Sequence, residues 1–311
     1  MYFMDKAKVT FLGTGSAIPT AKRNHIGILV SYRDENLLFD CGEGIQRQFR
    51  IAKLNPGKVN RIFISHWHGD HVLGLPGLLQ TFDLNGKNGE LIIYGPQGSK
   101  KRFQELIAPH LKFYWDISRK NGNKIDIKVK EVGEGVVLEE KDFKVEAIET
   151  DHGCRGLTYS FTVKSRKRMD AKKLKKLGDI KGPVIGELAA GKKVKIKGKI
   201  VDGGKLIYEE PERKIAFILD SRMKKEFVSF IKGSDILASE ATYFDDDELA
   251  NEHGHMTAMQ AVSLAKKAKV GKLLLFHFSQ RLEAIMRDVE KGVKKGFKES
   301  VLCRDFDSFE F

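Results

Sequence analysis

The sequence has only three cysteines, Cys41, Cys154 and Cys303, among 311 residues. They lie far apart and are odd in number, which argues against a disulfide framework and is typical of a reducing compartment. No apolar run approaches the length that spans a membrane, and the first residues, MYFMDKAKVTFLG, lack the apolar stretch of a signal peptide. We therefore expect a soluble, cytoplasmic protein with no membrane partner.

The chain also lacks short-period repeats and low-complexity tracts, which excludes a repeat architecture. Its length suits two ordinary domains, or one large α/β domain with an insertion. Strand-like and helix-like segments alternate through a first half and again through a second half. This double alternation predicts an α/β fold in which two central sheets stack and helices cover their outer faces. The expected strands are 8–13, 27–32, 36–40, 61–65, 90–95, 124–132, 143–152, 214–221, 235–241 and 272–279, and the expected helices are 44–52, 75–84, 101–111, 223–232, 258–268 and 281–295.

Positive charge is abundant but unevenly distributed. Lysine and arginine number 55 against 42 acidic residues, for a net charge of +13. Residues 164–199 alone hold 14 basic and three acidic residues, a local excess of 11. Lysine-rich segments are most often solvated faces, but this one also carries interleaved apolar residues that a small fold could bury. It interrupts the strand and helix pattern, so we predict an inserted basic module that contacts a phosphate backbone.

The stretch SHWHGDH concentrates three of the nine histidines directly after the buried strand pattern RIFI. In a bent loop, His66 and His68 can converge on one point, while Asp70 and His71 can face a second point nearby. Imidazoles suit zinc, iron and copper, whereas a carboxylate suits a harder or more highly coordinated ion. The spacing H-x-H-x-D-H after a strand therefore indicates a pair of metal ions.

Four residues cannot complete the coordination of two ions, so further ligands must come from elsewhere. Three candidates follow strand patterns: His152 after VEAIETD, Asp220 after KIAFIL, and His277 after KLLLF. Each one alone is better explained as a cap or a polar core group. The whole set favours a dinuclear centre.

These motifs carry a resemblance to a known family. H-x-H-x-D-H with a later His, Asp and His resembles the signature of the metallo-β-lactamase superfamily, and the chain is similar, essentially from end to end, to the short-form tRNase Z family. The matching stretches are SHWHGDHVLGLPGLL, FLGTGSAIPT, FDCGEGIQRQ, TDHG, LDSR, SEAT and FHFSQR. KGPVIGELAAG resembles that family's flexible exosite arm. The resemblance implies a metallo-β-lactamase fold over residues 1–311, a four-layer αβ/βα sandwich, with an inserted flexible basic arm at 164–204 that binds tRNA.

The resemblance also implies a function. It is that of a zinc-dependent endoribonuclease that removes the 3′ trailer from precursor tRNA by metal-hydroxide attack on a phosphodiester and leaves a 3′ hydroxyl on the tRNA. Two Zn²⁺ per chain are implied, with Mn²⁺ or another divalent ion as the alternative. The implied ligands are His66, His68 and His152 for the first ion, Asp70, His71 and His277 for the second, and Asp220 as a bridge.

Further catalytic roles come from the same resemblance. Asp70 would also accept the proton of the attacking water. His255 would protonate the leaving ribose oxygen, and Glu240 would orient His255 through a hydrogen bond. Thr257 belongs to the same family motif but can equally be the N-cap of the helix that follows. His253 is better explained as a surface or packing residue.

The substrate contacts are implied less directly, because the chain departs from the family pattern in three loops. The family's HEAT tetrapeptide is SEAT here, its HST tripeptide is HMT, and its P-x-K-x-R-N loop is PTAKRN, with the lysine one place late. The implied substrate-binding residues are Lys22, Arg23, Asn24, Ser279, Arg281, Gly182 and Pro183. The expected partners are precursor tRNA and a second copy of the chain, since short-form relatives are homodimers.

Three other functions fit parts of the sequence. A small-molecule hydrolase of the same fold, such as a thioesterase, a lactonase or a generic zinc phosphodiesterase, has no use for the basic arm. A non-catalytic RNA-binding protein with a structural zinc would more often use cysteine ligands. A redox di-iron protein would use a set richer in carboxylates and a flavin partner.

Overall fold

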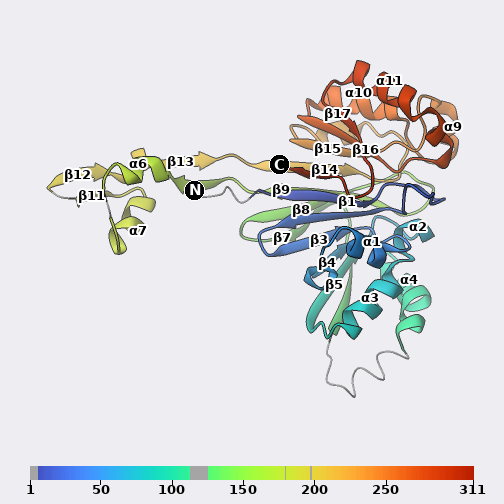
Figure 1. Ribbon diagram of the computed structural model, residues 1–311, viewed down its shortest axis with the longest axis horizontal. Helices are drawn as coiled ribbons and strands as arrows, with labels where there is room; N and C mark the ends of the chain where they lie inside the picture. The colour runs from blue at the N-terminus through green and yellow to red at the C-terminus, as the bar shows by residue number, and fades with distance from the viewer. Residues whose placement is uncertain (1–5, 113–124, 179, 197) are drawn as a thin grey trace. The chain divides into compact units, whose positions relative to one another are not determined.

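The computed structural model describes residues 6–112, 125–178, 180–196 and 198–311. The chain forms two compact units (Figure 1). We call Asp5–Phe161 with Lys214–Phe311 the core unit, and Thr162–Arg213 the arm unit. All three cysteines are free thiols. Within the described ranges, no helix combines the length and apolar character needed to cross a bilayer.

The first sheet of the core unit has seven strands in the order β18-β1-β2-β3-β4-β5-β6. The last strand of the chain, β18, pairs antiparallel with β1, and β3 to β6 run parallel to one another. The strands are β1 Lys8–Gly13, β2 Gly27–Tyr32, β3 Glu35–Phe39, β4 Arg61–Phe63, β5 Gly89–Gly95, β6 Ile125–Glu131 and β18 Ser308–Glu310.

The second sheet has seven strands in the order β17-β16-β15-β14-β9-β8-β7. Strands β14 to β17 are parallel, so the ends at which β14, β15 and β16 finish lie along one edge. The strands are β7 Gly135–Glu139, β8 Phe143–Glu149, β9 Leu157–Val163, β14 Arg213–Ile218, β15 Ile236–Glu240, β16 Lys272–Phe276 and β17 Ser300–Leu302.

Aromatic side chains fill the space between the two sheets. The ring centroids of Phe39 and Phe217 lie 4.7 Å apart, and Phe63 lies 5.5 Å from Tyr159. Neighbouring residues such as Leu38 and Leu273 point to the outer faces, which helices cover. The central strands are therefore buried on both faces, which explains the continuous apolar runs in strands such as KLLLF.

Helices α1 and α3 cover the first sheet, and α8, α10 and α11 cover the second. This confirms the predicted four-layer α/β arrangement. The predicted final helix is instead a 3-10 turn, η4, followed by α11, and predicted helix 101–111 contains a π-helical turn, η2. The helical elements are α1 Ile45–Ile51, η1 Pro56–Lys58, α2 Gly69–Val72, α3 Leu75–Leu84, α4 Ser99–Arg102, η2 Phe103–Ile107, α8 Glu226–Phe230, α9 Asp247–Glu252, α10 Ala258–Ala268, η4 Gln280–Ile285 and α11 Met286–Gly296.

The arm unit is built from two antiparallel strand pairs. Strand β10 (Arg166–Met169) pairs with β13 (Ile207–Glu210), and β11 (Lys193–Ile196) pairs with β12 (Lys199–Asp202). Between them lie α6 (Ala171–Lys175), α7 (Pro183–Ala189) and the turn η3 (Gly203–Leu206).

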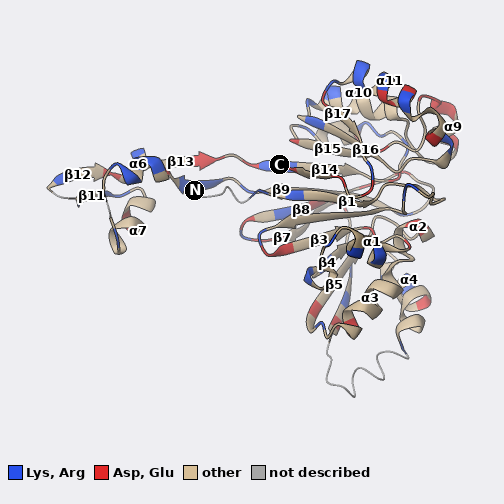
Figure 2. Ribbon diagram, in the orientation of Figure 1, with Lys and Arg blue, Asp and Glu red and all other residues tan. Residues whose placement is uncertain are grey.

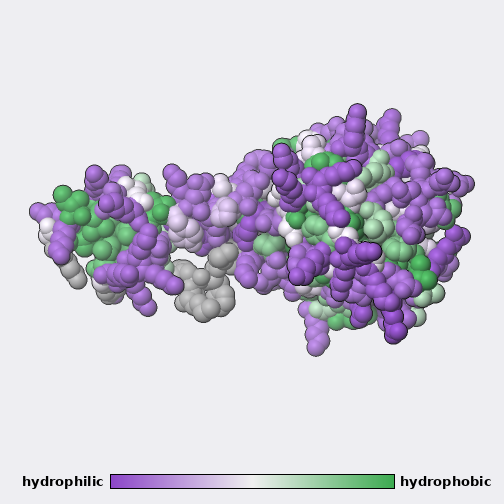
Figure 3. All heavy atoms as spheres, turned by 90° about the horizontal axis from the view of Figure 1, so that it is seen from above, coloured by the Kyte–Doolittle hydropathy of each residue, from purple (hydrophilic) through white to green (hydrophobic). Residues whose placement is uncertain are grey.

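The surface of the arm unit mixes basic and apolar groups. Lysine and arginine lie on β10, α6, β11 and β12, whereas β13 carries Glu209 and Glu210 (Figure 2). Apolar residues also reach its surface (Figure 3), among them Ile200, which is 74% exposed. Beyond β9, Leu188 and Leu206 are the buried apolar side chains in the described part of the unit, so its hydrophobic core is small.

Candidate metal centre

Strand ends deliver the histidines and carboxylates that the motifs singled out. His66 follows β4, Asp220 follows β14, and His277 follows β16 directly. His277 has a φ of 60°, in the left-handed region that non-glycine residues rarely adopt. The chain therefore turns sharply at this strand end, as it does at Asp40 after β3, where φ is 54°.

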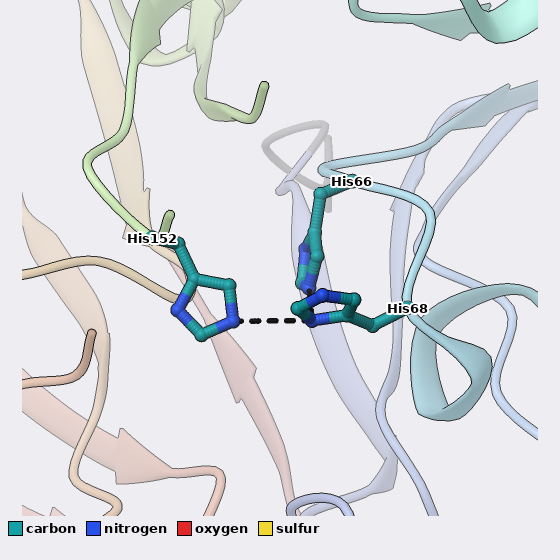
Figure 4. A group of neighbouring side chains, drawn as sticks. All are labelled: His66, His68 and His152. Carbon is teal, nitrogen blue, oxygen red and sulfur yellow. Dashed lines mark hydrogen bonds between the residues drawn. The ribbon is translucent and has the colours of Figure 1, made fainter. Parts of the chain in front are cut away.

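A first cluster consists of His66, His68 and His152 (Figure 4). Nε2 of His66 lies 2.9 Å from Nδ1 of His68, and Nε2 of His152 lies 3.2 Å from that same Nδ1. Zinc holds its nitrogen ligands at about 2.0–2.1 Å, so neighbouring ligand atoms in a tetrahedral site are about 3.3–3.4 Å apart. The three nitrogens thus surround one point at close to the required spacing.

A second cluster consists of Asp70, His71, Asp220 and His277. Oδ2 of Asp70 lies 3.4 Å from Nε2 of His71 and 3.5 Å from Nε2 of His277. The carboxylate of Asp220 approaches the same two nitrogens, with Oδ2 3.3 Å from His71 and Oδ1 3.3 Å from His277. These separations also match a tetrahedral set of ligands.

Asp220 lies between the two clusters. Its Oδ2 atom is 3.9 Å from Nε2 of His66 and 3.7 Å from Nε2 of His152, in addition to its contact with His71. Burial alone would raise the pKa of Asp220, but His277 and His71 hold it well below its usual range. An ionised carboxylate therefore faces both sets of nitrogens.

Several of these atoms have no hydrogen-bond partner in the part of the chain that the structure describes. Three of them are buried without such a partner: Nε2 of His71, Nε2 of His277 and Oδ1 of Asp220. An unpaired buried polar atom costs about 1–3 kcal/mol, so three converging ones indicate a missing partner. The atoms are imidazole nitrogens and carboxylate oxygens, which fit a pair of divalent ions such as zinc.

Asp40 and Ser65 orient two of these histidines through hydrogen bonds with the Nδ1 atoms of the rings. Oδ2 of Asp40 accepts a hydrogen bond from Nδ1 of His71 at 2.7 Å. The Ser65 hydroxyl donates to the same Oδ2 at 2.7 Å and accepts from Nδ1 of His66 at 3.0 Å. Both rings then carry their proton on Nδ1 and leave Nε2 free, as metal-binding histidines require.

His152 and His277 are oriented in the same way by other groups. Nδ1 of His152 donates to the carbonyl of Gly254 at 2.7 Å. A Cβ at Gly254 would lie 2.9 Å from that nitrogen, so only glycine leaves room for this approach. The Thr242 hydroxyl lies 3.0 Å from Nδ1 of His277 and donates to Glu240 at 2.7 Å, so it accepts the His277 proton.

His255 and Glu240 form a pair that adjoins the clusters, with Nδ1 of His255 3.9 Å from Oδ2 of Asp220. Nδ1 of His255 lies 3.2 Å from both carboxylate oxygens of Glu240. Glu240 is fully buried, and the backbone N–H of Ser221 donates to it at 2.8 Å. Burial alone would lower the pKa of His255, but Glu240 and Asp220 raise it to about 9. His255 is therefore protonated at neutral pH in this environment.

Thr257 is the N-cap of α10. Its hydroxyl accepts from the N–H of Gln260 at 3.0 Å, and the Gln260 side chain accepts in return from the N–H of Thr257. This reciprocal capping box confirms the capping role that the sequence left open.

A pocket of about 400 Å³ opens beside the clusters. Its lining includes His68 and His152 from the first cluster, and His255. Two residues predicted to bind substrate, Ser279 and Arg281, also line it. His253, for which we expected only a surface or packing role, lines the pocket as well.

The other predicted substrate residues occupy different environments. Lys22 is exposed, but Arg23 is buried and donates to the Thr14 hydroxyl and to the carbonyl of Cys303, both at 2.6 Å. The Asn24 amide donates to the carbonyl of Glu43 at 2.7 Å. The side chains of Arg23 and Asn24 thus attach the loop to neighbouring segments of the core unit.

Gly182 and Pro183 lie in the arm unit at the start of α7. Gly182 is the N-cap with a φ of 81°, and Pro183 takes the first helical position, where its missing N–H costs nothing. This local geometry alone explains the Gly-Pro pair, and their contact with substrate stays a prediction.

The sequence did not reveal the residues that orient the histidines. Asp40 and Thr242 lie within the matched stretches FDCGEG and SEAT, and Ser65 directly precedes His66, but nothing local gave them a role. Gly254 contributes only its carbonyl oxygen, for which a sequence carries no signal. A polar residue directly after a strand, as at Asp40, was the one usable indication.

Comparison with known proteins gives concordant matches. A family model described as "Anti-Pycsar protein Apyc1" matches residues 7–173, and one described as "Beta-lactamase superfamily domain" matches residues 202–278. The chain is 38% identical over 277 residues to Ribonuclease Z of Methanothermobacter thermautotrophicus, covering 88% of this chain and 87% of that one. It is 39% identical over 284 residues to Ribonuclease Z of Methanocaldococcus jannaschii, covering 89% and 87%.

Solved structures give the same picture. Human tRNase Z, short form, superposes with a TM-score of 0.64 at 26% identity, covering 97% of this chain and 98% of that one. The metallo-β-lactamase fold protein YhfI from Bacillus subtilis superposes with a TM-score of 0.69 at 22% identity, a likeness of fold.

Proposed function

This chain belongs to the ribonuclease Z family and, by its match over residues 7–173, also to the family of the Apyc1 model; we propose that it is an endoribonuclease that removes the 3′ trailer from precursor tRNA. One observation carries the proposal: seven histidine and aspartate side chains converge on two adjacent points in a chain similar to enzymes of that name. The reaction is hydrolysis of one phosphodiester bond, which leaves a 3′ hydroxyl on the tRNA.

The metals of this proposal are two zinc ions per chain, with Mn²⁺ or another divalent ion as the alternative. His66, His68 and His152 would hold one ion, and Asp70, His71 and His277 the other, with Asp220 shared. When bound, such a pair supplies a water nucleophile that is deprotonated near neutral pH and positive charge beside the phosphoryl oxygens.

The protein's own groups perform the remaining tasks. Asp70 is 10% exposed, and although burial opposes ionisation, His71 and His277 hold its pKa below its usual range. Asp70 is therefore ionised and can accept a hydrogen bond from water in the centre; accepting that water's proton is the role proposed for it from its place in the family motif. Asp40 and Thr242 hold His71 and His277 in a single tautomer. This reduces the reorganisation that the two rings need in order to bind a metal ion.

His255 is the proposed general acid. The leaving group is a ribose 3′ oxygen, which needs a proton because an alkoxide is a poor leaving group. His255 lines the pocket beside the clusters and is held by Glu240, so it can present its other ring nitrogen to that oxygen. The high pKa of His255 supports this role because it keeps the proton available at neutral pH.

The arm unit is the proposed tRNA-binding exosite. Its basic side chains would contact the phosphate backbone, which gives affinity and orientation without reading the sequence. Such contacts suit a substrate recognised by shape. A homodimer in the cytoplasm completes the proposal, and sedimentation of the purified protein tests the dimer.

Incubation with a precursor tRNA that carries a 3′ trailer, followed by mapping of both product ends, tests this function. One cut at the trailer boundary, a 3′ hydroxyl on the tRNA, and loss of activity with a chelator are the expected results. Hydrolysis of small phosphodiesters without cleavage of precursor tRNA would contradict the proposal and favour a small-molecule hydrolase. The matched control is His66→Ala, which removes a ligand and is expected to abolish cleavage.

A further inference from the structure

Tyr243 is the largest side chain of the pocket beside the clusters, and neither the motifs nor the mechanism gives it a role. Its ring centroid lies 6.3 Å from that of His255 and 5.9 Å from that of His253, with interplanar angles of 51° and 35°. All three rings line the same pocket. An aromatic surface therefore begins directly beside the proposed general acid.

The backbone of Tyr243 is fixed relative to His255. Its N–H donates to the carbonyl of Met256 at 3.4 Å, and its carbonyl accepts from the N–H of Ala258 at 2.8 Å. An isolated β-bridge pairs Tyr243 with Thr257, the capping residue of α10. Met256 and Ala258 flank Thr257 and belong to the segment that carries His255. The backbone of Tyr243 is therefore held beside that of His255.

Other parts of the pocket suit a nucleotide. Ile18 is 54% exposed although it is a large apolar residue, and it lines the pocket with the exposed cation Arg281. The loop that carries Ile18 is attached beside the metal centre, because the N–H of Ser16 donates to the carbonyl of Phe278 at 3.2 Å. Aromatic, apolar and cationic groups thus surround a space of about 400 Å³.

The position of the acid identifies which nucleotide this pocket faces. Cleavage breaks the bond between phosphorus and the 3′ oxygen, and water supplies the new oxygen on phosphorus while the 3′ oxygen takes a proton. That oxygen belongs to the last nucleotide of the tRNA product. In the proposed mechanism its ribose therefore lies at His255 and its base lies one sugar away from the acid, within reach of the Tyr243 ring, whose centroid is 6.3 Å from that of His255.

We infer that Tyr243 is the stacking platform for the base of the nucleotide that supplies the leaving 3′ oxygen, with Ile18 and Arg281 lining the same subsite. This rests on the proposed function, and it adds a binding contact on the tRNA side of the cut. Stacking tolerates any base because each base has a π-face. The subsite would accept all four bases while still requiring that a base be present.

The inference is tested by comparing how tightly two RNA hairpins, neither of which can be cleaved, bind to the unaltered protein and to variants of Tyr243. The probe is a 5′-labelled hairpin that copies the tRNA acceptor stem and ends at the cleavage nucleotide, with either a normal or an abasic last residue. Its affinity for the metal-loaded protein is measured by fluorescence anisotropy. For the unaltered protein, removing the base is expected to weaken binding by about 5- to 150-fold, the range that base–aromatic stacking supplies.

The variants separate stacking from other roles of Tyr243. In Tyr243→Ala the affinity difference between the two hairpins is expected to shrink to less than about twofold. Tyr243→Phe is the matched control, and it keeps the difference because it keeps the ring. An equal dependence on the base in Tyr243→Ala and in the unaltered protein, or no dependence in the unaltered protein, would overturn the inference. Failure to cleave precursor tRNA would count against the proposed function, whereas these affinities judge the subsite alone.

Discussion

Nδ1 of His71 lies 2.7 Å from Oδ2 of Asp40, and both side chains are fully buried. The same carboxylate accepts both the backbone N–H and the hydroxyl of Ser65 at 2.7 Å. One aspartate thus fixes the tautomer of one candidate ligand directly and positions a second, His66, through Ser65. Such a residue controls metal affinity although it touches no metal.

Asp40→Asn is expected to weaken binding of the metal by roughly 10- to 100-fold. The amide places an N–H₂ group where an oxygen now accepts, so one of the bonds to Ser65 or His71 must be lost. Competition with a chromogenic chelator measures the affinity. Asp34→Asn, at an exposed turn before β3, is the control and should leave the affinity unchanged. Equal affinities in both variants and in the unaltered protein would show that Asp40 has no such influence.

Protein purified without chelator is expected to contain close to two divalent ions per chain. Seven ligand residues exceed what one tetrahedral ion can use, and they form two clusters that share Asp220. Elemental analysis gives the number and identity of the ions. A reproducible content of one ion at full activity would contradict a shared pair. In Asp220→Ala the content is expected to fall, because both clusters lose a carboxylate.

His255→Ala is expected to slow cleavage of precursor tRNA by about 10²- to 10⁴-fold, the usual contribution of a general acid. An activated aryl phosphodiester should lose much less, because its leaving group departs without a proton. The ratio of the two kcat/KM values is the measurement. Glu240→Gln should shift the ratio in the same direction and less strongly, since it removes a charge but not the acid. Equal losses on both substrates at unchanged metal content would rule out an acid role for His255.

The pH profile of tRNA cleavage is expected to fall on its alkaline side. The pKa of His255 is raised from its ordinary value of 6.5 to about 9, so the acid is fully protonated below pH 7 and loses its proton as the pH rises through 9. Above that pH, kcat/KM should decrease tenfold per unit. The decline should be absent in His255→Ala and absent for the aryl substrate. A decline of equal shape in the variant would assign it to another group.

Removal of the arm should separate RNA binding from chemistry. Met169 and Ile207 are paired residues of β10 and β13, so a two-residue turn such as Asn-Gly can replace residues 170–206. Hydrolysis of a small phosphodiester and metal content should persist, while affinity for precursor tRNA falls. The slope of log affinity against log salt should flatten by about 0.9 for each lost phosphate contact. Unchanged affinity and slope would mean that the arm is not the exosite.

Neutralising basic residues elsewhere controls for net charge in that experiment. Lys291, Lys294 and Lys295 lie on α11 of the core unit and can be changed together to glutamine. This variant is expected to retain the tRNA affinity and the salt slope. A loss as large as that of the arm deletion would instead indicate a general effect of charge.

The sequence by itself predicted the two-sheet α/β architecture and the candidate ligand residues that the structure brings together. Apolar runs ending in a polar residue predicted the strands, and the H-x-H-x-D-H motif with its later His, Asp and His singled out the residues that follow them. Asp220 and His277 follow parallel strands of the second sheet, whose ends lie along one edge, whereas His66 follows β4 of the first sheet. The end strands β17 and β18 gave no such signal, because they are three residues long and depend on their neighbours for pairing.

Only the tertiary structure decided what surrounds those ligands. His152 is oriented by a carbonyl 102 residues away, and His277 by the hydroxyl of Thr242, 35 residues away. Arg23 matched a substrate-binding motif, yet its guanidinium is buried beneath the loop that carries it. Tyr243 and Ile18 line one pocket although 225 residues separate them in the sequence. Hydrogen-bond partners and burial depend on the distance between side chains in space, and sequence spacing constrains that distance only within a single strand or helix turn.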